Sequence, residues 1–390
     1  SSENRMSIAS EESTRTTKTV TTRIVPAWLA GSVAAYFLTS FFSNFYPWSY
    51  QFVLLSLLFQ LLCGTLIFLF SNAIHQKSQT ERHIDPLAVL TLLVAFGVSV
   101  SAVIVSWQFP GLFDRRILFM DFSRLPLFVL LSLLSLAASI VLLKTAKANE
   151  FFERLKQTSF FKFTRENIPG ILLSLFFLFT YLIFAESINF PGFRTLDQFF
   201  DTDISEWLDR LTSTTLEEAS IVRAVHPAIL LFLRPLVWFV SIFLNGDRLQ
   251  AVFLIHALAG AACVMLLWLI VKRASGNTTY ALIFAGLLGV SASHLLLSSM
   301  LETYIYSALA LLLFTFLLQT ERTSLKFTAP VGVLVFGITV TNLIQTCILY
   351  VFNYPRIKVI FKYVLMVLLI TAGLNLLQVW MYPNARALFQ

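Results

Sequence analysis

A succession of apolar runs, each about long enough to cross a lipid bilayer, is the feature that most constrains this chain. From Ile24 onward the runs follow one another with mostly short polar interruptions. A helical span needs roughly 20 predominantly apolar residues. Because the runs are continuous rather than alternating, they do not fit the strands of a transmembrane barrel. The sequence therefore predicts an all-α fold, a polytopic transmembrane helical bundle with interfacial amphipathic helices.

We expect about eleven spans in this bundle. They are 24–43, 51–73, 87–107, 125–143, 167–187, 227–244, 249–271, 278–298, 302–320, 328–352 and 359–381.

The composition excludes other classes of protein. Hydrophobic residues make up 57% of the 390 residues and charged residues only 13%, whereas a soluble domain is about 25% charged. A soluble globular enzyme is therefore excluded. Cys63, Cys263 and Cys347 lie in apolar runs without metal-like spacing, so we interpret them as buried thiols. The net charge of +7 suits contact with membrane lipids rather than nucleic acid, since no basic stripe is interleaved with aromatic residues.

The chain divides into four predicted regions. Residues 1–23 are polar and lack the apolar core of a signal peptide, which indicates a disordered cytoplasmic tail. Residues 24–143 form a four-span block. Residues 144–166 form a basic linker whose Phe positions suggest a helix lying in the membrane interface. Residues 167–390 form a second membrane module that is interrupted by an acidic loop, 188–226.

The distribution of basic residues orients the first half. The tail, 74–86 and 144–166 carry four, two and six Lys and Arg, whereas 44–50 and 108–124 carry three together. By the positive-inside rule the N-terminus is cytoplasmic and the acidic loop lies on the outer or lumenal side of a plasma or inner membrane. The charges after 227 leave the orientation of the second half open.

The acidic loop holds the first candidate site. Asp201 and Asp203 are two carboxylates one residue apart, and such a pair can hold a divalent cation, Mg²⁺ or Mn²⁺, or supply a general base. The alternative is a solvated loop in which Asp203 caps a helix. The residues that follow predict a short surface helix, because their apolar members fall at i, i+3, i+4 and i+7. These members are Ile204, Trp207, Leu208 and Leu211.

Further candidates lie downstream. Arg234 is a charge inside an apolar run and could meet a phosphate, or it could pair with a nearby acid. His226 could donate to a phosphate or be a structural residue at the interface. Glu302, at the junction of two apolar runs, is a site candidate or a helix-start acid. His256, within a span, is interpreted as a packed hydrogen-bonding residue.

The order of these features resembles the GT-C superfamily of integral-membrane glycosyltransferases. The residues that carry the likeness are Val225-His226-Pro227, Arg234-Pro235 and Ser298-Ser-Met-Leu-Glu302-Thr-Tyr304, within roughly 167–381. The resemblance implies a polyprenyl-phosphate-linked sugar as donor. It implies Asp201 or Asp203 as general base or metal ligand, with Glu302 near the acceptor or sugar.

The same resemblance places His226 and Arg234 near the donor phosphate. Arg223 and Tyr304, beside these motifs, are further substrate-binding candidates. The sequence thus favours a membrane glycosyltransferase that acts at the outer face. Two alternatives remain: a non-catalytic scaffold or accessory subunit of a membrane protein complex, and a lipid or small-molecule transporter. The sequence shows no paired interrupted spans of the kind that inverted-repeat transporters carry.

Overall fold

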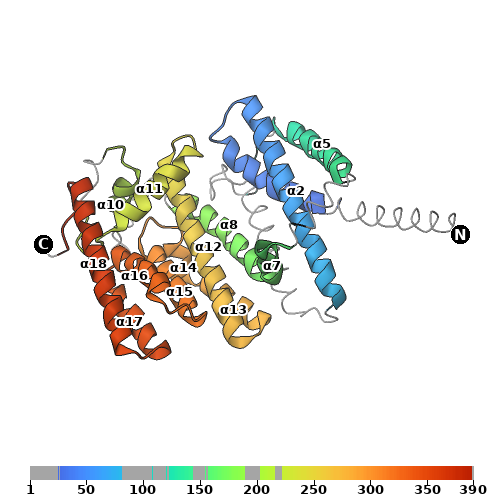
Figure 1. The fold of residues 1–390 in the computed structure, drawn as a ribbon. Helices are drawn as coiled ribbons and strands as arrows, with labels where there is room; N and C mark the ends of the chain where they lie inside the picture. The colour runs from blue at the N-terminus through green and yellow to red at the C-terminus, as the bar shows by residue number, and fades with distance from the viewer. Residues whose placement is uncertain are drawn as a thin grey trace. The chain divides into compact units, whose positions relative to one another are not determined.

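The computed structural model describes residues 27–80, 123–143, 157–188, 203–215 and 222–388, together with residues 25, 108, 120 and 154. Within these ranges the fold is all-helical, with one isolated bridge between Val222 and Ala385 (Figure 1). The described residues form two compact units, one ending at Ile168 and the other beginning at Pro169. We call them the N-terminal unit and the C-terminal unit and describe each by itself.

Small and polar residues join the helices of the N-terminal unit. Its elements are a helix over 27–43, α2 (Ser49–Thr80), α5 (Leu125–Leu143) and α7 (Ser159–Glu166). A Cβ built on Gly31 would lie 2.7 Å from the Cα of Gly64, so these two backbones touch. Ser32 donates to the Oε1 of Gln60 over 2.9 Å and lies 2.7 Å from the hydroxyl of Ser132. Close backbones joined by polar side chains are typical of helix packing in membranes.

Helix α7 lies in the basic linker 144–166, for which the sequence predicts a helix. Residues 159–166 are helical as expected for the basic linker, with Phe161 buried and Phe160 72% exposed. The other apolar linker positions, Phe151, Phe152 and Leu155, lie outside the described residues.

The C-terminal unit is built around α12 (Arg248–Ser275), which packs against α11 (Ile229–Ile242), α13 (Thr278–Val290) and α15 (Tyr304–Gln319). Next to α15 lie α16 (Leu325–Ile338) and α17 (Asn342–Asn353), and α16 in turn contacts α18 (Ile357–Met381). The remaining elements are α8 (Ile168–Ile188), α10 (Ile204–Thr212) and α14 (Ala292–Leu297).

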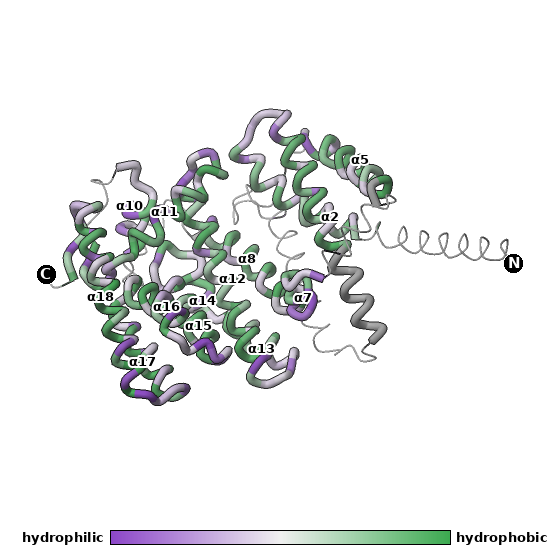
Figure 2. Tube along the Cα trace, viewed as in Figure 1, coloured by the Kyte–Doolittle hydropathy of each residue, from purple (hydrophilic) through white to green (hydrophobic). Residues whose placement is uncertain are grey.

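Four helices of the described chain are long and apolar enough to cross a membrane. They are Ser49–Phe68, Ile168–Glu186, Arg248–Ser275 and Ile357–Met381, and shorter apolar helices accompany them (Figure 2). Half of the apolar stretch of α12 is buried, but only 17% of that of α18. An apolar helix with so little protein around it is suited to contact with lipid. The expected span 87–107 lies outside the described residues.

Two expected spans are interrupted in the structure. The run 278–298 ends its first helix at Val290, because Ser291 is extended (φ −61°, ψ 136°), and a short helix follows. The run 328–352 breaks between α16 and α17, where Thr339 is extended (φ −151°, ψ 120°). Hydropathy averaged over a span misses both breaks because the polar residues at them, Ser291 and Thr339, are flanked by long apolar stretches.

Partners outside the helix stabilise the second break. The backbone N–H of Ala228 donates to the carbonyl of Gly337 over 2.9 Å, and that of Val340 donates to Val225 over 3.1 Å. The run Ile338-Thr-Val-Thr341 is also β-branched, which lowers helix propensity. The chain therefore leaves the helix at this point and pairs with the segment before α11.

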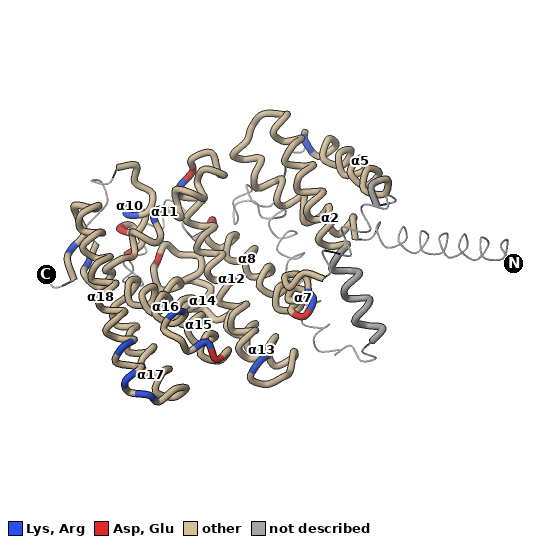
Figure 3. Tube along the Cα trace, viewed as in Figure 1, with Lys and Arg blue, Asp and Glu red and all other residues tan. Residues whose placement is uncertain are grey.

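This break settles where the basic segments of the C-terminal unit lie relative to one another. Because α17 runs back along α16, the hydroxyl of Tyr350 near the end of α17 donates to the carbonyl of Thr323 over 3.2 Å. Arg273, in the last turn of α12, donates to the carbonyl of Gln319 over 3.2 Å. The basic residues around 273, 322 and 356 thus share one end of the unit, as Figure 3 shows near α15 and α17. A single span over 328–352 would have separated them.

Candidate functional site

The short amphipathic helix predicted after Asp203 is present as α10 (Ile204–Thr212). Its apolar stripe is largely buried, with Ile204, Trp207 and Leu211 at 6%, 1% and 1% exposure. Glu206 in the first turn and Arg210 in the last turn complement the helix dipole. Asp203 occupies the N-cap position as expected, but its side chain makes no capping hydrogen bond. The carboxylate of Asp203 is therefore available for another role.

Asp203, Glu302 and Arg223 come together at the start of α10. The backbone N–H of Asp203 donates to Oε1 of Glu302 over 2.6 Å. The carboxylate of Asp203 lies 3.5 Å from the guanidinium of Arg223, and these side chains are 30% and 61% exposed. Three of the candidates named from the sequence thus meet, although Glu302 is distant from the other two in the chain.

Glu302 projects from a buried segment that is not helical. Residues 298–303 connect α14 to α15, and each is at most 3% exposed. His256 of α12 lies with Nε2 3.0 Å from the carbonyl oxygen of Glu302 and Nδ1 2.8 Å from the hydroxyl of Tyr306. Nδ1 also lies 2.9 Å from the carbonyl oxygen of Val252. Both ring nitrogens thus have hydrogen-bond partners, which confirms His256 as a packed hydrogen-bonding residue.

The segment 298–303 contacts α12 well beyond the start of that helix. His256 is eight residues after Arg248, which at about 1.5 Å per residue is about 12 Å along the helix. Irregular backbone at such a depth in a membrane protein occurs where it is buried in protein or lines a cavity. The segment 298–303 fits this description, because it is buried in protein and the start of α10 contacts Glu302.

His226 lies between the α10 site and the break after α16. Its ring is edge-on to Trp207, with 5.2 Å between centroids, and Nδ1 is 2.6 Å from the carbonyl oxygen of Ile338. Burial lowers the pKa of His226, and the charges of Arg210 and Arg223 lower it further, against the opposing effects of the Ile338 carbonyl and Asp203. The neutral imidazole is thus favoured, and Nδ1–H donates to Ile338.

Arg210 belongs to this site although the sequence reasoning missed it. It is 1% exposed, forms an ion pair with Glu206, and stacks over Trp207 with 4.6 Å from the guanidinium carbon to the ring centroid. Burial lowers the pKa of Arg210, while Glu206 and Asp203 act in the opposite direction. The Glu206–Arg210 spacing of four residues was the available signal.

Arg234 lies at the other end of α10. Its Nη2 donates to the carbonyls of Ser213 and Thr215 and to the hydroxyl of Ser213, over 2.9, 2.7 and 3.0 Å. Ser213 is ten residues beyond Asp203, or about 15 Å along a helix. Arg234 and the Asp203–Glu302 contact therefore do not form one site, against the convergence that the resemblance implied.

Arg234 is fully buried and held from several sides. Its guanidinium lies over the rings of Trp238 and Tyr382, at 5.3 and 5.4 Å, and among the described residues its Nε and Nη1 have no hydrogen-bond partner. Arg248, which the sequence reasoning also missed, donates to the same Ser213 carbonyl. The two arginines together anchor the C-terminal end of α10.

The remaining site candidates from the sequence are Tyr304 and Asp201. Tyr304 is the first residue of α15 and is 60% exposed, and Asp201 lies outside the described residues. No group of three His, Cys, Asp or Glu that could hold a metal occurs among the described residues. The Asp203 carboxylate faces a guanidinium, which opposes a cation. The other carboxylate of the predicted metal pair, Asp201, lies outside the described residues, so the predicted Mg²⁺ or Mn²⁺ site stays a prediction.

Long apolar helices, one of them exposed along most of its length, define the class of a helical membrane protein. No family model, curated protein or solved structure matches this chain. Any more specific function must therefore be argued from the geometry of the site.

Proposed function

We propose that this chain is a membrane glycosyltransferase that moves a sugar from a polyprenyl-phosphate donor to an acceptor at the outer or lumenal face. The observation that carries the proposal is the meeting of Asp203, Glu302 and Arg223 at the start of an amphipathic surface helix. An acid beside a guanidinium at the level of a membrane-surface helix is where a lipid-borne phosphate and a polar acceptor could meet.

Each residue has a distinct role in this proposal. The acceptor hydroxyl or amine attacks the anomeric carbon and gives its proton to the Asp203 carboxylate, while the bond from that carbon to the phosphate oxygen breaks. Arg223, 61% exposed, stabilises the charge that builds on the leaving lipid phosphate. Glu302 positions Asp203 through the backbone N–H. The phosphate role falls to Arg223 rather than Arg234, whose Nη2 hydrogen bonds go to the chain's own loop.

The proposed orientation follows from the shared basic end of the C-terminal unit. Arg273, Arg322 and Arg356 lie at the opposite end of α15 from Glu302. The positive-inside rule then puts this basic end in the cytoplasm and Asp203 outside. Together with a cytoplasmic N-terminus, this is the multi-pass topology we propose, in a plasma or inner membrane and with about eleven spans.

A second candidate function is a non-catalytic accessory subunit. It is favoured by Arg234, because a buried cation used to anchor a loop is what a purely structural role requires. The 80% exposed Trp380 and 67% exposed Leu376 on α18 would then meet a partner helix instead of lipid.

Reconstitution with labelled donors tests the proposal. The full chain is placed in proteoliposomes with radiolabelled undecaprenyl-phosphate glucose, mannose or arabinose, and release or transfer of the label is measured. We expect Asp203→Asn to reduce turnover at least about 100-fold, as loss of a general base does. Asp247→Asn is the matched control, because Asp247 caps α12 by accepting from the Gln250 N–H and asparagine caps equally well.

The outcomes separate the two candidates. Turnover that is lost in Asp203→Asn and retained in Asp247→Asn supports the enzyme. Turnover that is equal in the wild-type chain and Asp203→Asn contradicts Asp203 as the base. Absence of label release with all three donors, from a chain whose Tm shows it folded, favours the accessory subunit.

A further inference from the structure

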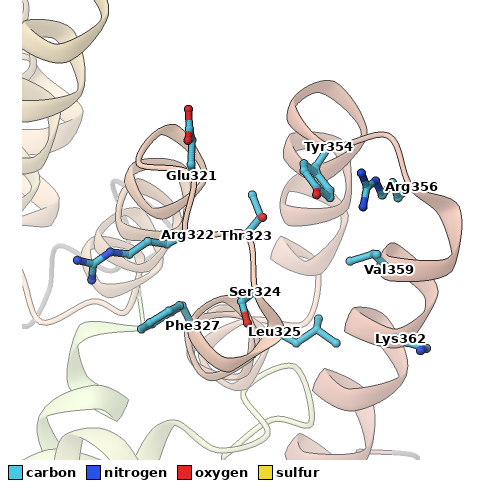
Figure 4. Close-up of a pocket in the computed structure, with 10 residues that line it drawn as sticks. All are labelled: Glu321, Arg322, Thr323, Ser324, Leu325, Phe327, Tyr354, Arg356, Val359 and Lys362. Carbon is cyan, nitrogen blue, oxygen red and sulfur yellow. The ribbon is translucent and has the colours of Figure 1, made fainter.

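A hollow of about 600 Å³ lies at the basic end of the C-terminal unit, remote from Asp203 and Glu302. It is formed where α15 ends, α16 begins, α17 ends and α18 begins (Figure 4). Three cationic side chains line it, Arg322, Arg356 and Lys362, against one acid, Glu321. The lining therefore carries a net positive charge.

The geometry of the hollow is fixed by buried contacts below it. Tyr350 donates to the carbonyl of Thr323 over 3.2 Å and also contacts the hydroxyl of Thr328. The hydroxyl of Tyr363 donates to that of Thr346 over 2.9 Å. Both tyrosines are fully buried. The helix ends that carry the cations are thus held in place without any ligand.

The backbone at the end of α15 sets where Arg322 lies. Glu321 has a left-handed conformation, with φ +59°. The N–H of Glu321 donates to the Leu318 carbonyl and that of Arg322 donates to the Leu317 carbonyl, each over 3.0 Å. This is the Schellman arrangement of a helix end, and it turns the chain sharply so that Arg322 lines the hollow. In Figure 4, Arg322 and Arg356 come from opposite sides of the hollow, and the side chain of Arg322 points away from Arg356, towards Phe327.

The cations are not neutralised by the protein. Within the part of the chain that the structure describes, no carboxylate lies within ion-pair distance of Arg322, Arg356 or Lys362. The guanidiniums rest instead on aromatic rings, Arg322 over Phe327 at 5.4 Å and Arg356 over Tyr354 at 4.7 Å. Such stacking leaves guanidinium N–H groups available to an anion.

Exposed bulky apolar side chains lie close in sequence to the residues that line the hollow. Phe352, Ile357 and Phe361 are 84%, 83% and 67% exposed. Phe352 lies near the end of α17, and Ile357 and Phe361 lie at the start of α18, one of the helices long and apolar enough to cross a membrane. Cations beside exposed apolar residues at a span terminus match a position at the headgroup level of a bilayer. A soluble anion would not contact these exposed apolar side chains, whereas the acyl chains of a lipid would.

We infer that this hollow binds the phosphate headgroup of an anionic glycerophospholipid, with Arg356 and Lys362 at the phosphate and the acyl chains along the exposed face of α18. The inference does not depend on the proposed glycosyltransferase activity, because the hollow and Asp203 lie at opposite ends of α15. It assigns a second lipid contact to the face that carries the basic residues.

Native mass spectrometry of the full chain in neutral detergent tests the inference, with dioleoyl-phosphatidylglycerol titrated as probe and dioleoyl-phosphatidylcholine as the uncharged comparison. We expect preferential binding of phosphatidylglycerol that weakens about fivefold in Arg356→Gln and again in Lys362→Gln, as one cation near a lipid surface contributes. Lys326→Gln is the matched control. It removes one exposed cation from the start of α16 that does not line the hollow.

Three results would overturn the inference. Equal loss in Lys326→Gln and Arg356→Gln would mean that only the overall charge matters. Equal binding of phosphatidylcholine and phosphatidylglycerol would remove the headgroup preference. Displacement of phosphatidylglycerol by added inorganic phosphate would assign the hollow to a soluble phosphate instead of a lipid. A Tm within the range of the wild-type chain shows that each variant is folded.

Discussion

Oε1 of Glu302 accepts a hydrogen bond from the backbone N–H of Asp203, with 2.6 Å between the two atoms, across 99 residues of sequence. This contact joins the surface helix α10 to the buried segment before α15. The Glu302 carboxylate is 3% exposed and also lies 3.4 Å from the N–H of Thr303. The Glu302 carboxylate is therefore the acceptor for two backbone N–H groups, those of Asp203 and Thr303.

The first prediction concerns this carboxylate. Glu302→Ala leaves the N–H of the half-buried Asp203 without its acceptor, and because a fully buried unsatisfied group costs about 1–3 kcal/mol, we expect a loss towards the lower end of that range. Glu302→Gln keeps one acceptor oxygen and should cost less. We expect a lower Tm for the alanine variant than for the glutamine variant, with faster hydrogen exchange in 203–212 measured by mass spectrometry. Equal Tm values for the alanine variant and the wild-type chain would contradict the structural role of the contact.

The second prediction concerns the other end of α10. Arg234→Gln removes the Nη2 hydrogen bonds to Ser213 and Thr215 from a fully buried site, and hydrogen bonds of a charged group contribute about 1.5–3 kcal/mol. We therefore expect a large fall in Tm.

Arg273→Gln is the control for this prediction. Arg273 is exposed and donates one hydrogen bond, to the Gln319 carbonyl, so its loss should cost no more than about 0.5 kcal/mol. If Arg234→Gln instead leaves Tm unchanged and raises the KM for a polyprenyl-phosphate donor, Arg234 is a phosphate ligand and not an anchor.

The third prediction is a pH dependence at His226. Because burial depresses the pKa of His226 below the ordinary value of 6.5, the unfolded chain takes up a proton at this residue more readily than the folded chain. The contribution of neutral His226 to the free energy of unfolding is fully present above pH 6.5. It is lost as the pH falls from 6.5 towards the depressed pKa of His226 in the folded chain. Burial is the main cause of the shift in the pKa of His226, and the Ile338 carbonyl and the charges of Arg210, Asp203 and Arg223 modify it.

Comparison with His226→Gln isolates this contribution from other groups that titrate. Between pH 7.5 and pH 5.5 we expect the Tm of the wild-type chain to fall more than that of the variant. Parallel Tm curves over this range would show that His226 has the same proton affinity in both states.

The sequence predicted the local structure of the site better than the long-range contacts between its residues. The i, i+3, i+4, i+7 stripe placed α10 correctly, and the N-cap position of Asp203 followed from the same pattern. The contact between Asp203 and Glu302 could not be predicted, because hydropathy carries no information on which of several apolar runs pack together. The same holds for Arg234, whose partners Ser213 and Thr215 are loop carbonyls that no side-chain pattern reveals.

The helix breaks escaped prediction for a related reason. Hydropathy shows 328–352 as one run, since Ile338 and Val340 are as apolar as the helices around them. The chain breaks there because the carbonyl of Gly337 and the N–H of Val340 pair with 225–228. This tertiary contact brings the start of α18 to the same end of the C-terminal unit as Arg273 and Arg322, which hydropathy alone does not reveal.

The fourth prediction uses two helix ends with the same backbone conformation. Glu321 after α15 and Gly276 after α12 have φ of +59° and +67°. A left-handed conformation costs a residue with a side chain roughly 1–2 kcal/mol, but costs glycine little. No atom lies within 4 Å of a Cβ built on Gly276, so a substitution there meets conformational strain alone.

Exchanging the two residue types should therefore have opposite effects. Glu321→Gly should raise stability by up to about 1 kcal/mol, and Gly276→Ala should lower it by about as much. Tm measurements of both variants in the same detergent test this. Because Glu321 is the acid that lines the basic hollow, Glu321→Gly should also strengthen phosphatidylglycerol binding, and a stabilised variant with weakened lipid binding would show that this acid helps to shape the hollow rather than opposing its charge.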